Sequence, residues 1–199
     1  MLLDVDESQL VLVDYQERLM PAIFEGPQVL ANAVRLARMA KMLQVPVWGT
    51  EQNPERLGHN APQLAELCGQ TLAKMHFSAV GDGLGARLRA PTRQGGRSRN
   101  SPQPGRKGLE EQAARPVIVV AGCEAHVCLL QTALDLVDEE FDVWVVTDAC
   151  GSRTEHNRDA AYDRLAGAGV ELVTTEMVAF EWLRTCTHPQ FKPVQALIK

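Results

Sequence analysis

The chain has 199 residues, a formal net charge of −5 and 45% hydrophobic residues, which suits a single soluble globular domain. The acidic balance argues against a general role on nucleic acids or membrane surfaces. No apolar run approaches the roughly 18 residues of a membrane span, and the N-terminal segment carries acids where a signal peptide would carry basic residues.

Short apolar segments alternate with amphipathic segments along the chain. The pattern predicts strands at 10–14, 46–50, 70–74, 116–121, 141–147 and 170–174. It predicts helices at 27–43, 62–68, 126–138 and 156–168. Strands that alternate with helices form right-handed crossovers and a parallel sheet covered on both faces. The sequence therefore predicts an α/β fold with three layers, α/β/α.

The segment at about 85–109 breaks this alternation. It holds seven basic residues and no acid, and proline, glycine and serine are frequent in it. One interpretation is a solvated surface insertion, and the other is a basic lid that attracts an anionic substrate or partner. We expect one domain over 1–199 with this basic insertion.

The cysteine pattern indicates neither a disulfide framework nor a zinc site. The five cysteines are an odd number without CxxC spacing or a Cys/His cluster, at positions 68, 123, 128, 150 and 186. A reducing, cytoplasmic compartment is the simplest expectation. We predict no metal and no cofactor.

Cys128 occupies the most informative position in the chain, in the segment PVIVVAGCEAHVCLLQTALDL at 116–136. The segment reads as a buried strand, a tight connection and a helix that begins near His126. A thiol at a helix N-terminus has a lowered pKa, because free N–H groups and the helix dipole favour the thiolate. The same N–H groups can hold an oxyanion. The alternative is that Cys128 is a small buried hydrophobic residue.

Two further reactive side chains end predicted strands. Asp14 ends the first strand and Lys74 ends the third, and the carboxyl ends of parallel strands share one edge of a sheet, where ligands bind. Asp14 can serve as the base for Cys128, and Lys74 can stabilise both anions. Lys74 starts roughly 10 Å away by strand spacing. Each residue also has a simpler interpretation: Asp14 as a helix-capping carboxylate, and Lys74 as a surface lysine.

Several segments resemble the isochorismatase-like (cysteine hydrolase) family, and within it the isochorismatase domain-containing proteins. The matching segments cover most of the chain outside 85–109: VLVDYQERL at 11–19, VPVWGTEQNPERLG at 45–58, LAKMHFSAV at 72–80, GCEAHVCLLQTALDL at 122–136, VVTDACGSR at 145–153 and HPQFKPVQALIK at 188–199.

This resemblance implies a six-stranded parallel sheet in the order 3-2-1-4-5-6 and a triad of Asp14, Lys74 and Cys128. It implies an oxyanion hole from the backbone N–H groups of Glu124 and Cys128, and a cis peptide between Cys123 and Glu124. It also implies a substrate pocket lined by three polar side chains: Gln16, Gln52 and His126.

Two differences from related enzymes narrow the range of reactions expected of this chain. Nicotinamidases of this family carry an Asp-x-His-x-His metal cluster after the second strand, whereas this chain has Thr50–Glu51–Gln52–Asn53–Pro54 there. Glu51 and His59 alone make a poor metal site. Members that cleave isochorismate lack the nucleophilic cysteine, so Cys128 argues against that reaction.

The sequence thus predicts a metal-independent hydrolase of a small amide or related acyl substrate that acts through a thioester. The alternatives are a non-catalytic scaffold or ligand-binding protein, and a redox-responsive thiol protein that pairs Cys128 with Cys123 or Cys150. We also expect a homo-oligomer. The physical hint for self-association is a group of apolar residues near the C-terminus: Met177, Val178, Phe180, Trp182 and Leu183.

Overall fold

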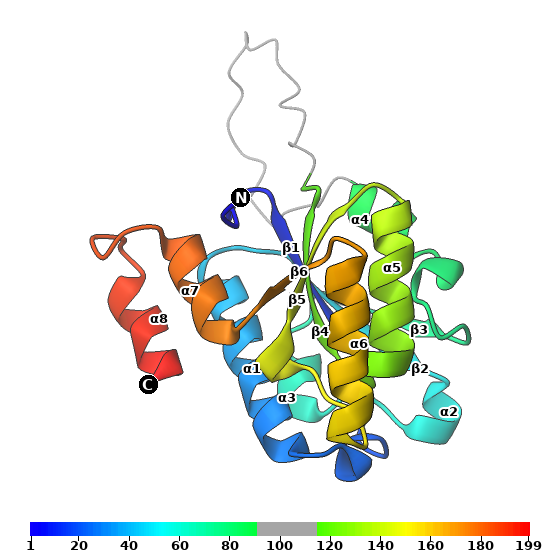
Figure 1. Ribbon diagram of the computed structural model, residues 1–199. Helices are drawn as coiled ribbons and strands as arrows, with labels where there is room; N and C mark the ends of the chain where they lie inside the picture. Colours follow the sequence, from blue (N-terminus) through cyan, green and yellow to red (C-terminus); the bar gives the residue numbers. More distant parts are fainter. Residues whose placement is uncertain (91–114) are drawn as a thin grey trace, which may run out of the picture.

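Six parallel strands form one sheet in the order β3-β2-β1-β4-β5-β6, which confirms the predicted fold class (Figure 1). The computed structural model describes residues 1–90 and 115–199. The strands are β1 (Ser8–Val13), β2 (Val47–Gln52), β3 (Gln70–Lys74), β4 (Val117–Gly122), β5 (Asp142–Val146) and β6 (Glu171–Val173).

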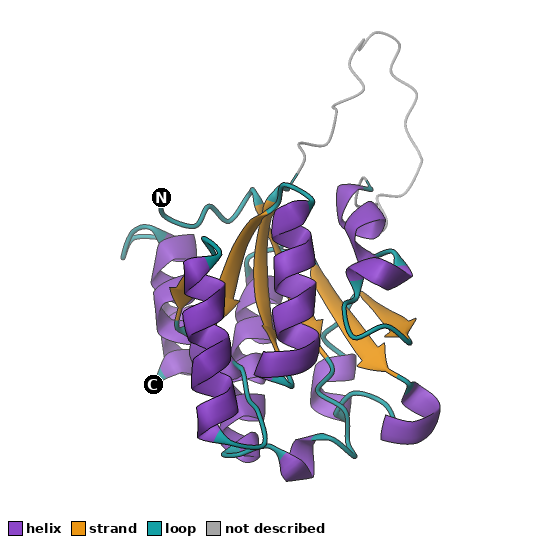
Figure 2. Cartoon of the chain, turned by 45° about the vertical axis from the view of Figure 1, so that its right-hand side comes forward, coloured by secondary structure: helices purple, strands orange, loops and turns teal. Residues whose placement is uncertain are grey.

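Helices cover both faces of the sheet (Figure 2). They are α1 (Gly26–Met42), α2 (Pro54–Leu57), α3 (Pro62–Ala65), α4 (Leu84–Arg89), α5 (Leu130–Asp138), α6 (Glu155–Gly167), α7 (Thr175–Leu183) and α8 (Phe191–Ile198). Helix α1 packs with α7 and α8 on one side, and α5 packs with α6 on the other. None of the described helices is long and apolar enough to cross a membrane.

The central strands are buried along their whole length, since helices cover both faces. Every residue of β1 and β4 is buried, as their continuous apolar sequences predicted. The register pairs Val13 with Thr50 on one side and with Gly122 on the other. A side chain at Gly122 would place its Cβ 2.5 Å from Val13, so only glycine permits this close approach. The carboxyl ends of β1, β2 and β4 therefore meet at one edge.

The observed elements differ from the predicted ones in the segment around Cys128 and in the predicted insertion. The predicted helix at 126–138 is divided into a π-helical turn (Ala125–Leu129) followed by α5; such wide turns are frequent at functional sites. Residues 85–89 of the predicted insertion belong to α4, whereas 91–109 lie outside the described residues.

Helices α7 and α8, which the periodicity analysis did not predict, complete the C-terminal part. Of the apolar set expected to mark an interface, Val178, Trp182 and Leu183 are buried in the core instead. Their burial follows from the packing of α7 on α1. Met177 and Phe180 remain exposed.

Candidate active site

Asp14 and Lys74 meet in a buried ion pair, although their strands are separated by β2. The Lys74 Nζ lies 2.8 Å from Asp14 Oδ2, and both side chains are 0% exposed. Asp14 follows β1 directly and has a φ of 54°, a left-handed conformation that non-glycine residues adopt mainly where surrounding structure holds it. The four-carbon arm of Lys74 therefore spans the gap that the strand spacing predicted.

The hydrogen bonds around this pair leave one carboxylate oxygen free. Thr50 Oγ1 donates to Asp14 Oδ1 at 2.7 Å. The three ammonium protons of Lys74 have three other acceptors, Gln52 Oε1 at 2.7 Å and the carbonyls of Phe77 and His76 at 3.0 and 3.3 Å. Asp14 Oδ2 thus contacts Lys74 electrostatically but accepts no hydrogen bond from the described residues.

Cys128 lies in the π-helical turn after β4 and is only 6% exposed. Its Sγ is 4.0 Å from Gln52 Oε1, the same oxygen that accepts from Lys74. Burial first, and then the negative charge of Asp14, raise the pKa of the Cys128 thiol to about 12, whereas Lys74 lowers it. The predicted lowering of this pKa is therefore wrong: desolvation disfavours the thiolate, and Lys74 is already paired with Asp14.

One backbone feature that the resemblance implied is present before Cys128. The peptide bond between Cys123 and Glu124 is cis. Within the described part of the chain, the N–H of Glu124 donates to no backbone carbonyl. The Glu124 carboxylate pairs with Arg153 at 2.7 Å, and His126 Nδ1 contacts Ser152 Oγ at 2.9 Å. Glu124 and His126 thus have structural partners that point them toward the segment after β5.

Gln16 and Gln52 bind one another, and of the two it is Gln52 that contacts Lys74 and Cys128. The side chain of Gln16 donates to the carbonyl of Gln52 at 3.0 Å and to that of Gly58 at 2.6 Å. In return the Gln52 N–H donates to Gln16 Oε1 at 2.8 Å. Gln16 is completely buried. It therefore holds the end of β2 in place, and this lets the Gln52 amide reach Lys74.

Thr50 is a site residue that the sequence analysis did not single out. It is completely buried and holds Asp14 twice, through its hydroxyl and through its carbonyl, which accepts from the Asp14 N–H at 3.2 Å. The sequence signal that could have found it was its position at the start of the TEQ segment (50–52), opposite the end of the first strand. Only the β1–β2 register showed that its side chain faces Asp14.

Glu51 and His59, the residues weighed as a metal site, bind each other instead. The His59 Nδ1 lies 3.0 Å from one Glu51 oxygen, and the N–H of Asn60 donates to the other at 2.8 Å. Across residues 1–90 and 115–199, no cluster of three or more His, Cys, Asp or Glu side chains is arranged to hold a metal. Independence from metal stays a prediction that needs a chelation experiment.

The other buried cysteines are poorly suited to redox chemistry. All five thiols are free. Burial raises the pKa of Cys123 well above its usual range and that of Cys150 to about 12. Since the thiolate is the reactive form, these environments disfavour rapid disulfide formation.

Comparison with known proteins agrees with the fold and the segments described above. The isochorismatase domain model matches residues 102–177. Human isochorismatase domain-containing protein 2 is 35% identical over 192 residues, which cover 96% of this chain and 83% of that protein. The rat protein of the same description is 33% identical over 194 residues, with coverages of 98% and 82%.

Solved structures that share the fold of this chain are found as well. The MAR1 ribonuclease from Caenorhabditis elegans is 29% identical with a TM-score of 0.84, over 100% of this chain and 92% of that one. The Escherichia coli YcaC gene product, an octameric hydrolase of unknown specificity, shares the fold at 23% identity and a TM-score of 0.78, over 98% and 95% of the two chains. With relatives above 30% identity along nearly its whole length, this chain belongs to the isochorismatase family.

Proposed function

We propose that this protein is a metal-independent cysteine hydrolase that cleaves a C–N or related acyl bond in a small amide through a thioester. The observation that carries the proposal is the fully buried Asp14–Lys74 pair next to Cys128. Burying two charges is costly and is more often found where chemistry needs them than where stability does. The low exposure of Cys128 favours a small substrate.

In the proposed first step, Cys128 Sγ attacks the carbonyl carbon while its proton passes to Asp14 Oδ2. A base is needed because the resting thiol, with a pKa of about 12, is protonated at neutral pH. The C=O electron pair moves to the oxygen, where the N–H groups of Glu124 and Cys128 stabilise it. The C–N bond then breaks, and the leaving amine takes the proton from Asp14.

In the proposed second step, water attacks the thioester carbonyl and gives a proton to Asp14. The C–S bond breaks, the carboxylic acid leaves, and the proton returns to Cys128. Lys74, 2.8 Å from Asp14 Oδ2, holds the Asp14 side chain in place between the steps. Gln52, whose amide touches Lys74 and lies close to Cys128, and His126 are the proposed contacts for the substrate, while Gln16 supports Gln52.

The test is a panel of small primary amides and acyl compounds incubated with the purified protein, with ammonia or acid release as the readout. Cys128→Ser should abolish release, and a substrate should add the mass of its acyl group to the wild-type chain. Cys186→Ser, at an exposed thiol, is the matched control and should behave as wild type. Turnover that survives Cys128→Ser would refute the proposal.

A second candidate follows from the C. elegans relative, which is described as a ribonuclease. Phosphodiester cleavage needs cations for the phosphate. Lys74 is the cation at this site, and Asp14 and three hydrogen-bond acceptors already surround it. We therefore favour the amide. Cleavage of a labelled RNA that Cys128→Ser abolishes would reverse this choice.

We also propose that the chain forms a homo-oligomer. Its support is the exposure of Met177 and Phe180, at 45% and 42%, together with the octamer formed by the E. coli protein of the same fold. Light scattering at micromolar concentration tests it. A monomer mass would reject it.

A further inference from the structure

The loop that follows β3 holds the Lys74 ammonium with its backbone carbonyls. Lys74 Nζ donates to the carbonyls of Phe77 and His76, at 3.0 and 3.3 Å. The carbonyl of Met75 accepts from the side chain of Gln52 at 2.9 Å. Three successive carbonyls thus face the candidate active site. Since two of the three hydrogen-bond acceptors of Lys74 belong to this loop, the place of its charge depends on the conformation of the loop.

Asp82 binds the N–H groups of the same loop from the other side. Its Oδ2 accepts from the backbone N–H of His76 at 3.0 Å and from that of Met75 at 3.1 Å. The His76 ring adds a contact of 3.1 Å from Nδ1 to the same oxygen. Partial burial raises the pKa of Asp82, but these hydrogen bonds outweigh it and leave the pKa below its usual value. Asp82 is therefore a charged acceptor at neutral pH.

The segment that carries Asp82 is tied to the helix after Cys128. Asp82 ends a short 3₁₀ turn, η2 (Val80–Asp82), and its N–H donates to the carbonyl of Ala79 at 3.2 Å. The N–H of Ala79 in turn donates to the hydroxyl of Thr132 at 3.0 Å, and Thr132 is completely buried in α5. Thr132 lies about one helical turn after Cys128. The loop thus connects the end of β3 to the segment that carries the proposed nucleophile.

We propose that Asp82 is a positioning residue, which binds the loop at 75–77 so that its carbonyls hold the Lys74 ammonium against Asp14 and beside Cys128. This inference rests on the proposed function, in which Cys128 is the nucleophile. Without Asp82 the carbonyls of the loop are free to turn away. A buried ammonium that loses its acceptors moves toward other acceptors or water, so its influence on the Cys128 thiol weakens.

Alkylation of Cys128 by iodoacetamide reports the position of Lys74, because Lys74 lowers the pKa of that thiol. Asp82→Ala should slow alkylation near neutral pH by roughly three- to tenfold, the effect of a rise of about half to one unit in the pKa of the thiol. The loss of an anion alone would act in the opposite direction, since it favours the thiolate. A slower reaction therefore identifies lost positioning rather than lost charge.

Asp82→Asn is the conservative variant. Its amide oxygen can accept from both backbone N–H groups of the loop, although the side chain carries no charge. Alkylation of Cys128 should therefore return to nearly the wild-type rate. The comparison of alanine with asparagine isolates the two hydrogen bonds, because both variants lack the carboxylate.

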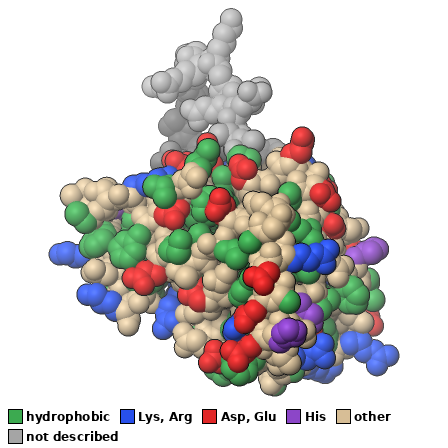
Figure 3. All heavy atoms as spheres, viewed as in Figure 1, with side chains coloured by type: hydrophobic (Ala, Val, Ile, Leu, Met, Phe, Trp, Pro, Cys, Tyr) green, Lys and Arg blue, Asp and Glu red, His purple; other side chains and the backbone are tan. Residues whose placement is uncertain are grey.

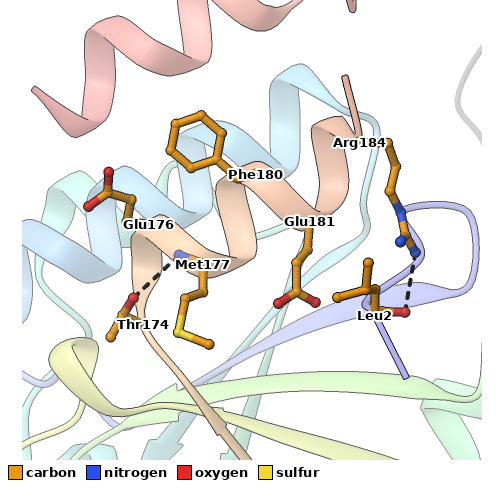
Figure 4. Close-up of a pocket in the computed structure, with 7 residues that line it drawn as sticks. All are labelled: Leu2, Thr174, Glu176, Met177, Phe180, Glu181 and Arg184. Carbon is orange, nitrogen blue, oxygen red and sulfur yellow. Dashed lines mark hydrogen bonds between the residues drawn. The ribbon is translucent and has the colours of Figure 1, made fainter. Parts of the chain in front are cut away.

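Glu176→Ala controls for the loss of a surface carboxylate. Glu176 lies in the first turn of α7, which follows β6 at the edge of the sheet opposite β3. It lines an open hollow of about 440 Å³ whose described lining includes no triad residue (Figure 4). Figure 3 shows acidic and basic side chains together on this side of the molecule. Cys128 of this variant should be alkylated at the wild-type rate.

A double-mutant cycle shows whether Asp82 acts through Lys74. In a Lys74→Ala background, Asp82→Ala should change the alkylation of Cys128 no further, because the group that it positions is gone. A loosened loop that merely exposes the thiol would act in both backgrounds. Thermal unfolding identifies the variants that fold, and the comparison of Asp82→Ala with Asp82→Asn does not require Lys74→Ala to fold.

The outcomes separate this inference from the proposed function. Slower alkylation in Asp82→Ala, recovery in Asp82→Asn and no further effect without Lys74 support it. A rate in Asp82→Ala that is unchanged or faster, an equal loss in Asp82→Asn, or an effect that persists in the Lys74→Ala background overturns it. The triad still stands in these cases if Asp14→Asn and Lys74→Ala move the Cys128 profile. If they do not, the proposed function fails as well.

Discussion

Lys74 Nζ lies 2.8 Å from Asp14 Oδ2 in the interior, with neither side chain exposed, although a whole strand separates their backbones. Two opposite charges without water between them depend strongly on each other. Removing one leaves the other buried and uncompensated. The pair therefore links the stability of the fold to the chemistry proposed for Cys128.

Lys74→Met should destabilise the protein by about 3–5 kcal/mol, the usual cost of an unpaired buried charge. Adding Asp14→Asn removes that charge, so the double variant should recover much of the loss. Urea unfolding of the single and double variants measures the coupling. Additive losses would show that the two side chains are not energetically coupled.

The titration of Cys128 should shift in opposite directions when either charge is removed. With a pKa of about 12, the wild-type thiol is protonated near neutral pH, and its alkylation by iodoacetamide should rise roughly tenfold per pH unit between pH 6 and 9. Asp14→Asn removes an anion that disfavours the thiolate, so the pKa should fall and alkylation should speed up. Lys74→Ala should raise the pKa and slow it.

Mass spectrometry of the Cys128 peptide gives these rates, with the exposed Cys186 as internal reference. Both variants should lose turnover, Asp14→Asn despite its more reactive thiol, because the attack then has no proton acceptor. If neither substitution moves the Cys128 profile, the three residues do not act together and the scaffold hypothesis is preferred.

Thr50→Val should destabilise the protein by about 1–3 kcal/mol, the cost of leaving a buried acceptor without its donor. Valine matches threonine in shape but cannot donate to Asp14 Oδ1. Thr50→Ser keeps the hydroxyl and should cost distinctly less. The comparison of urea midpoints isolates the hydrogen bond, and equal losses in the two variants would show that packing, not the hydroxyl, is what matters.

Exhaustive chelation should leave hydrolysis and Cys128 alkylation unchanged, because Glu51 and His59 satisfy each other and Asn60. Metal analysis of the purified protein should find less than stoichiometric zinc. Activity that is lost on chelation and restored by zinc would contradict this expectation.

The strand pattern could be predicted from the sequence because buried parallel strands need continuous apolar segments. That pattern placed Asp14 and Lys74 at the ends of their strands and Cys128 at the start of the helical segment that follows β4. The order of the strands and the cis peptide before Glu124 came from the family resemblance. Helix α7 was not predicted, because it buries residues on several sides and shows no simple helical period. The π-helical turn and helix α8 were also not predicted.

The sequence by itself determined which reactive groups reach the edge of the sheet. The tertiary structure decided their chemical state. Position at a helix N-terminus predicted a thiol that ionises easily, but burial and the neighbouring Asp14 raise the pKa of Cys128. Desolvation depends on every atom packed around a group. Whether Lys74 pairs with Asp14 or stabilises the Cys128 thiolate depends on the distances between the strands. Neither quantity is a property of local sequence.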